Sequence, residues 1–184
     1  PHGVYFTGGE LLVPDLGADR IYHYDPDDGT LRSEQSVSPG AGPRHLTRDG
    51  AFLVNELDNT VRSVNDDGPA VSTLPPGWRG ESSTAEIVRH ERMLYVSNRG
   101  HDSIAGFAGG SDLRAVQHAS SHGRHPRHCL IDPDGRWLLV ANRDTNNIVC
   151  LPILANGLLG DPVAETTCPA PVCLRHWDAD RTTG

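Results

Sequence analysis

Two copies of the tripeptide Pro-Arg-His occur in this chain of 184 residues, at 43–45 and at 126–128. A single carboxylate, Glu86, stands in a short apolar stretch midway between them. Imidazoles transfer protons near neutral pH, and guanidinium groups hold a carboxylate or a phosphate through paired donors. A glutamate beside arginines stays ionised and can serve as a base or as a partner. These residue types are therefore suited to chemistry on a small anion.

Apolar runs recur along the chain, and each is preceded at a similar distance by polar residues. These polar residues are His2, Arg44, His45, Glu86, Arg127 and His128. When repeats curve into a ring, their equivalent positions lie around one axis, so residues distant in sequence become neighbours. We therefore expect His45, His128 and Glu86 to act as acids or bases. Arg44 and Arg127 would bind an anion. The alternative is that these polar groups hydrogen-bond one repeat to the next and have only a structural role.

The apolar runs that would position these residues belong to a repeat that extends from end to end of the chain. Each copy has a short apolar run, a polar turn and a second apolar run, a pattern typical of a β-hairpin. The hairpins are predicted at 10–24, 51–64, 93–107 and 137–151. Their anchor residues, Val13, Val54, Val96 and Val140, lie 41, 42 and 44 residues apart.

A further short segment lies upstream of each hairpin and carries the polar candidates. These segments are 1–4, 42–46, 84–88 and 125–129, and a fifth follows the last hairpin at 170–174. One repeat is thus an inner strand, a hairpin and an outer strand, which is the content of a propeller blade. No stretch of ten or more residues has a helical period. The sequence predicts an all-β chain, a β-propeller of four-stranded blades with about four blades present.

The composition excludes several classes of function. A net charge of −8 without long charge runs argues against nucleic acid and anionic membranes as partners. No apolar stretch approaches the roughly 20 residues that span a bilayer, and no signal-peptide pattern is present. The four cysteines show no zinc-ligand spacing, which favours free thiols in the reducing cytoplasm. Dinucleotide and nucleophilic-serine motifs are also absent. We therefore expect a cytoplasmic protein without metal or cofactor.

Several long motifs identify a family resemblance. The segments "VPDLGADRIYHY", "GAGPRHL", "YVSNRGHDSIAGF" and "GRHPRHCLIDPDGRWLLVAN" resemble the 6-phosphogluconolactonase-like family of seven-bladed propellers. Fungal carboxy-cis,cis-muconate cyclase is similar in fold and belongs to the same group. The resemblance implies a site in the central channel. It implies that the channel motifs of the family correspond to Arg44, His45, Arg127 and His128, its buried glutamate to Glu86 and its "SNRG" arginine to Arg99.

Arg99 is the one candidate outside the inner strands. Arg99 lies in the segment 98–102, which is predicted to be a hairpin turn, as is the segment 142–144. Asn, Asp and Gly are common in such turns for conformational reasons. The resemblance makes Arg99 a substrate-binding candidate beside Arg44 and Arg127.

The resemblance also implies a function. It indicates a lactonase that hydrolyses a small acidic lactone of the sugar-phosphate type, with a lactone or carboxylate as ligand. A muconate-type cyclase and a non-catalytic propeller that binds a ligand or a protein are the alternatives. Four repeats are fewer than seven, so residues 1–184 are expected to be one partial propeller domain, the C-terminal portion of a longer chain. Alone, without the missing blades, this portion is expected to be inactive.

Overall fold

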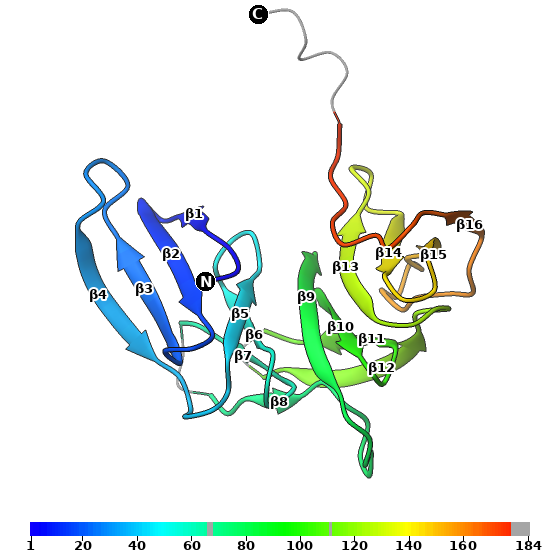
Figure 1. The fold of residues 1–184 in the computed structure, drawn as a ribbon, viewed down its shortest axis with the longest axis horizontal. Coiled ribbons are helices and arrows are strands. Elements are labelled where there is room, and N and C mark those ends of the chain that lie inside the picture. The colour runs from blue at the N-terminus through cyan, green and yellow to red at the C-terminus, as the bar shows by residue number, and fades with distance from the viewer. Residues whose placement is uncertain (66–67, 111, 178–184) are drawn as a thin grey trace, which may run out of the picture.

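The computed structural model describes residues 1–65, 68–110 and 112–177, and these residues form sixteen β-strands and no helix (Figure 1). The strands form four antiparallel sheets of four strands each, and within every sheet they follow one another in chain order. The prediction of an all-β chain of four-stranded blades is confirmed. None of the described residues belongs to a helix that could cross a membrane.

The predicted hairpins coincide with the two middle strands of each blade. The first blade contains β1 (Tyr5–Thr7), β2 (Glu10–Asp15), β3 (Arg20–Tyr24) and β4 (Leu31–Ser36). The second contains β5 (Pro43–Leu46), β6 (Phe52–Asn55), β7 (Thr60–Ser63) and β8 (Val71–Ser72). The third contains β9 (Ser83–His90), β10 (Met93–Arg99), β11 (Ser103–Ala108) and β12 (Arg114–Ser120). The fourth contains β13 (Pro126–Ile131), β14 (Trp137–Asn142), β15 (Asn147–Pro152) and β16 (Ala164–Thr167).

The inner strands were predicted less accurately at the two ends of the chain. The segment 1–4 is not a strand, because the first inner strand begins at Tyr5, opposite Leu12. The predicted fifth inner strand at 170–174 was wrong, since no strand lies there. A strand needs the hydrogen bonds of a neighbour, and within the described residues no strand follows this segment to pair with it.

One anchor residue was also placed one position too late. The last pair of each middle hairpin joins Asn98 to Ser103 in the third blade and Asn55 to Thr60 in the second. Two residues before these asparagines stand Val96 and Leu53. Leu53 is therefore the equivalent of the other anchor valines, and Val54 points to the opposite face of its sheet. The spacing missed this because the second repeat is shorter between its inner strand and its hairpin: Pro43 pairs with Asn55, whereas the equivalent Pro126 pairs with Asn142, which is four positions further along.

Apolar side chains fill the space between successive blades. Leu12 and Ile21 of the first blade pack on Leu46, Leu53 and Val64 of the second. Phe52, Val54 and Val61 pack on Leu94, Val96 and Phe107 of the third. Tyr95 and Ile104 of the third pack on Leu138, Val140 and Val149 of the fourth. Each repeat thus contributes one apolar face to the blade before it and one to the blade after it, and burial of each such side chain stabilises the stack by about 1.5–3 kcal/mol.

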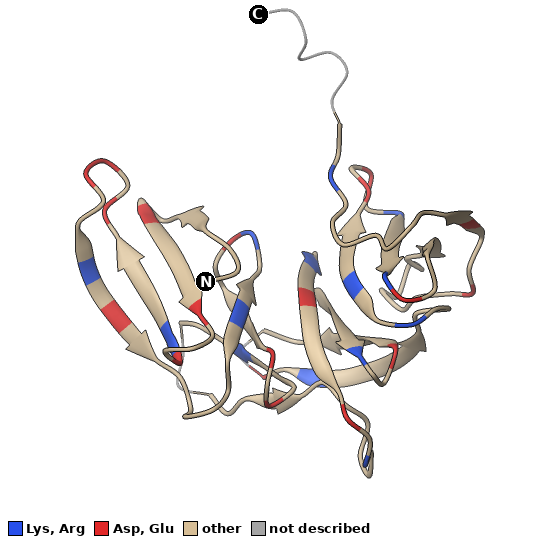
Figure 2. Ribbon diagram, in the orientation of Figure 1, with Lys and Arg blue, Asp and Glu red and all other residues tan. Residues whose placement is uncertain are grey.

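The blades follow one another in an arc with the inner strands β1, β5, β9 and β13 toward its concave side (Figure 1). The outer strands β4, β8, β12 and β16 lie on the far side of their blades (Figure 1). Charged positions occur on the inner strands β5, β9 and β13, although these strands also carry apolar residues (Figure 2). The fold therefore brings the polar candidates from three blades to one side of the arc.

Candidate functional site

Three inner strands share a local irregularity where their polar residues lie. In β5 the partners of Pro43 and His45 are adjacent on β6, so Arg44 is an extra residue in the ladder. In β13 Arg127 is extra in the same way, and in β9 the pairing shifts beside Glu86. Such β-bulges re-aim side chains and are common next to active sites. Here the bulge in β5 allows two consecutive side chains, Arg44 and His45, to reach the same region.

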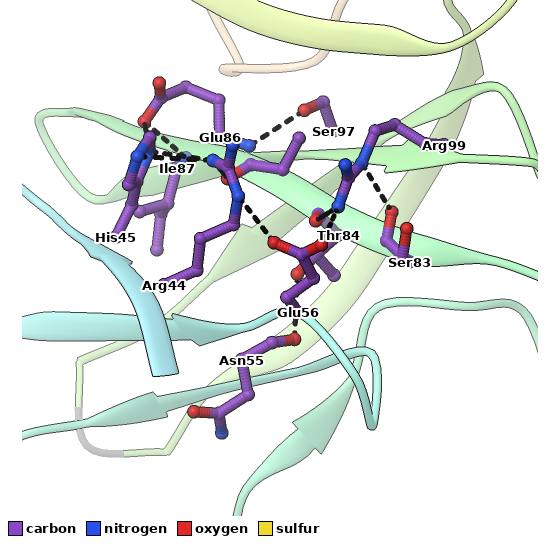
Figure 3. A network of polar contacts seen from close by, with 11 residues as sticks. Arg44, His45, Asn55, Glu56, Ser83, Thr84, Glu86, Ile87, Ser97 and Arg99 are labelled. Atoms are coloured by element: carbon purple, nitrogen blue, oxygen red, sulfur yellow. Dashed lines mark hydrogen bonds and ion pairs between the residues drawn. The ribbon is translucent and has the colours of Figure 1, made fainter. Parts of the chain in front are cut away.

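Glu86 connects the second, third and fourth blades. Its Oε1 accepts a hydrogen bond from His45 Nδ1 at 2.8 Å, and its Oε2 lies 3.1 Å from His128 Nε2. The backbone N–H of Ile87 also donates to Oε1, at 3.0 Å (Figure 3). All three side chains of this cluster are largely buried, with at most 14% exposed. The catalytic candidates of the sequence analysis are therefore in direct contact with one another.

The ionisation of this cluster follows from its contacts. Burial raises the pKa of Glu86, but the hydrogen bond of His45, the electrostatic attraction of His45 and His128 and the Ile87 amide outweigh it, so the pKa is lowered. Burial lowers the pKa of His128, against the opposing effect of Glu86. The backbone N–H of Leu174 donates to His128 Nδ1 at 3.4 Å, which leaves the ring proton on Nε2. Glu86 is thus an ionised acceptor held by two imidazoles.

The contact with Glu86 fixes which ring nitrogen of His45 carries the proton. Because a carboxylate only accepts, the proton of the neutral ring stands on Nδ1 and the lone pair on Nε2. Arg44 Nη1 lies against the ring, 3.2 Å from this Nε2 and 3.2 Å from Nδ1. The same Nη1 donates to the carbonyl of Ala85 across the blade boundary. A proton acceptor and a cation therefore stand side by side.

Two arginines share a second carboxylate, Glu56. Arg44 Nε lies 2.7 Å from Glu56 Oε2, and Arg99 Nη2 lies 2.8 Å from Oε1 (Figure 3). The Nε–H of Arg44 is not aimed at the carboxylate, so that contact is an ion pair without a hydrogen bond. Burial raises the pKa of Glu56, but the hydrogen bond of Arg99 and the charges of both arginines lower it by more. The pKa is therefore below its usual value, and Glu56 is ionised.

The sequence analysis did not select Glu56, and it placed Arg99 in a turn. Arg99 is instead the last residue of β10 and is buried, with its Nη2 bonded to the carbonyl of Thr84. A signal for Glu56 was present: Asn55-Glu56, Asn98-Arg99 and Asn142-Arg143 are equivalent pairs in successive repeats. Opposite charges at equivalent positions of neighbouring blades indicate an ion pair across the blade boundary.

Arg127 differs from the other two candidate arginines. Its side chain is half-buried, and among the described residues it has no hydrogen bond or ion pair. Its positive charge is one of the causes that lower the pKa of Arg44, after burial and the charge of Arg99. Arg127 is therefore a cation of this region that is available to a ligand.

The first blade places Tyr5 and His2 near the Glu86 cluster, although neither binds Glu86. Burial, followed by the negative charge of Glu86, raises the pKa of Tyr5 to about 12, so Tyr5 remains a phenol. His2 is exposed ahead of β1, and its ring centroid lies 6.4 Å from that of His45. These two residues line the edge of the site on the side of the first blade.

An open hollow of about 750 Å³ lies away from this network, at the other ends of β9 and β13, and Arg48, Arg89, His90 and Asp132 are among its lining residues. Two of its charged groups already have partners: Arg89 pairs with Asp49, and Asp132 accepts from two backbone amides of its own turn. We therefore take the network around Glu86 as the candidate site, because buried titratable groups from three blades meet there.

Comparison with known proteins agrees with this architecture. Residues 1–176 match the family model described as "Lactonase, 7-bladed beta-propeller". The chain belongs to this lactonase family. Among curated relatives of this chain, 6-phosphogluconolactonase of Bacillus subtilis is 33% identical over 185 residues, which cover 90% of the chain and 53% of the relative. The chain spans about half the length of the curated relatives it matches.

Solved structures give the same result. A Lactobacillus plantarum protein matches this chain with a TM-score of 0.84 and 32% identity, over 94% of this chain and 57% of the other. The periplasmic gluconolactonase of Pseudomonas aeruginosa matches with a TM-score of 0.80 and 29% identity, over 95% and 56% of the two chains. The expected family and the partial-propeller fold are thus confirmed.

Proposed function

We propose that the protein from which this chain derives hydrolyses a small acidic lactone at the Glu86 site. The observation that supports this best is the contact of Glu86 with His45 Nδ1, which leaves His45 Nε2 as a proton acceptor 3.2 Å from Arg44 Nη1. A carboxylate, an imidazole and an adjacent cation are the groups that hydrolysis of an ester bond requires.

In the proposed reaction, His45 Nε2 removes a proton from a water molecule as its oxygen bonds to the lactone carbonyl carbon. Glu86 stabilises the imidazolium that forms, and Arg44 stabilises the negative charge on the carbonyl oxygen. The ring C–O bond then breaks, and the leaving alkoxide takes the proton from His45. The product is the open hydroxy acid. His128 positions Glu86 by binding its second oxygen.

The anionic part of the substrate is assigned to the arginines. Arg127 has free donors, and Arg99 Nη1 and Arg44 Nη2 make no hydrogen bond among the described residues. These donors suit a carboxylate or phosphate group. One relative is named a 6-phosphogluconolactonase and one similar structure a gluconolactonase, so a phosphorylated sugar lactone is our proposed substrate. Neither a cyclase nor a purely binding role is favoured by an observation at the site.

We further infer that residues 1–184 form one partial domain and that turnover requires a complete ring. The family has seven blades, and the chain has four. Three further repeats are expected in the coding sequence upstream of Pro1, and a different upstream sequence would contradict this. A cytoplasmic location stays a prediction, since one similar structure is that of a periplasmic protein.

The test of the proposed function is hydrolysis by the complete protein of 6-phosphogluconolactone beside unphosphorylated gluconolactone. We expect faster turnover of the phosphorylated lactone and loss of turnover in His45→Asn. Equal rates on both lactones would contradict the assigned anion site. Unchanged turnover in His45→Asn would contradict the proposed base.

A further inference from the structure

Residues 168–177 follow β16 and return to β13, the inner strand of the same blade (Figure 1). The backbone N–H of Leu174 donates to His128 Nδ1 at 3.4 Å. Two residues later, His176 Nε2 lies 2.8 Å from the carbonyl oxygen of Ile131, which accepts its proton. The segment is thus bonded to β13 at two positions, although it is not itself a strand.

The start of this segment has the backbone of an inner-strand entry. Ala170 has a φ of 42°, and its N–H donates to Asn146 Oδ1 in the preceding hairpin turn at 2.8 Å. Gly42 has a φ of 68° and makes the same contact with Asp19 Oδ1, at 2.9 Å, directly before β5. The residues after Ala170 are therefore equivalent to an inner strand, and the contact with His128 comes from a segment that the blade holds in place.

His128 has a defined tautomer, because its two ring nitrogens face groups of opposite kind. Nδ1 faces the N–H of Leu174, which only donates, so this nitrogen carries the lone pair. Nε2 lies 3.1 Å from Glu86 Oε2, which only accepts when it is ionised, so this nitrogen carries the proton. In an imidazolium, a second ring N–H would point at the N–H of Leu174. The contact with Leu174 therefore opposes protonation of His128.

The charged groups around His128 act in both directions. Burial lowers the pKa of His128, and Glu86 raises it. His45, Arg175 and Arg44 lower this pKa by electrostatic repulsion, and the backbone donor acts in the same direction. A neutral ring matters for the site, because an imidazolium 3.1 Å from Glu86 would neutralise the carboxylate that orients His45.

We propose that Leu174 is a positioning residue of the site, whose backbone N–H holds His128 as the neutral tautomer with the proton on Nε2. Glu86 then keeps its negative charge for His45, and the segment 168–177 belongs to the site. The tautomer follows from the contacts alone, whereas its effect on turnover rests on the proposed function.

The test uses the complete protein with ¹⁵N-labelled histidine, because the ring ¹⁵N chemical shifts distinguish the two neutral tautomers and the imidazolium. Leu174→Pro removes the N–H, and Leu174→Ala is the matched control that keeps it. Position 174 has no positive φ, and its N–H makes no other hydrogen bond among the described residues. The signal of His128 is identified by its loss in His128→Asn.

In the wild type at pH 7 we expect the tautomer with the proton on Nε2. Leu174→Pro should raise the pKa of His128 by about 0.4–1 pH unit, the effect of one hydrogen bond, and Leu174→Ala should leave this pKa unchanged. Turnover by Leu174→Pro should fall further below that of the wild type at pH 6 than at pH 8, because more His128 is protonated at pH 6. A merely structural role would lower turnover equally at both pH values.

A wild-type His128 with its proton on Nδ1, or protonated at pH 7, would overturn this inference, and that result does not depend on the folding of any variant. An equal pKa of His128 in Leu174→Pro and Leu174→Ala, in a protein that hydrolyses the lactone, would overturn the role of Leu174 alone. An equal loss of turnover at pH 6 and pH 8 would do the same. The expected change in pKa, combined with absence of lactone turnover by the wild type, would overturn the hydrolase and leave the tautomer of His128 assigned to Leu174.

Discussion

Replacing Glu86 by glutamine keeps the shape of the side chain and removes the charge that orients His45. Two imidazoles bind this carboxylate, at 2.8 and 3.1 Å, and a hydrogen bond to a charged group is worth about 1.5–3 kcal/mol. If half of that total acts in the transition state, about 1.5–3 kcal/mol of stabilisation is lost, which lowers kcat by roughly 10- to 150-fold. The carbonyl and the amide of glutamine cannot both accept, so the tautomer of one histidine is also disturbed.

The Glu86→Gln assay is steady-state hydrolysis by the complete protein, with urea unfolding of wild type and variant at two pH values. The pKa of Glu86 is below its reference of 4.5 in the folded protein, so its contribution to stability is present above pH 4.5 and lost as the pH falls through the folded value. Wild type and variant should therefore differ in stability at pH 7 and converge as the pH falls below 4.5 and through the folded pKa. The same activity per folded molecule in both proteins would refute the reasoning, because the site would then be only a structural contact between blades.

Four further predictions concern the groups around Glu86 and the open ends of the arc. Arg127→Ala should raise KM for the phosphorylated lactone by about 100-fold with an unchanged melting temperature, because its half-buried side chain makes no ion pair among the described residues. His45→Asn should lose about 100-fold in kcat yet still bind the product in calorimetry. Glu56→Gln leaves Arg44 and Arg99 without their shared carboxylate and should lower the free energy of unfolding by about 3 kcal/mol in urea titrations, with Glu81→Gln as an exposed control. The 184-residue chain should self-associate in size-exclusion chromatography, because the apolar faces of the two end blades lack a neighbour; a sharply melting monomer would contradict this.

The end blades illustrate what a repeat predicts and what it does not. Val13 and Leu139 are equivalent to buried residues of the other blades, but both are only half-buried, because each lies on a blade face without a neighbour. The sequence predicted the apolar residue at each position, since alternation is a local property. Whether that residue is buried depends on which blade packs against it.

The sequence by itself determined the blades and the position of each polar residue within its repeat. Apolar alternation and turn residues act over a few positions, so the hairpins and the inner strands β5, β9 and β13 were predictable from one repeat at a time. The convergence of His45, Glu86 and His128 followed from their equivalent positions in a ring. These features need only local propensity and the period of the repeat.

Only the tertiary structure decided which polar groups pair. The bulge at Arg44 turns two consecutive side chains toward the site, and Glu56 then takes both Arg44 and Arg99 across a blade boundary. Arg127, with the same sequence motif as Arg44, is left free for a ligand. The spacing could not separate these two arginines, because an ion pair depends on distances of a few ångströms between blades, and equivalent positions in a repeat do not have equivalent neighbours.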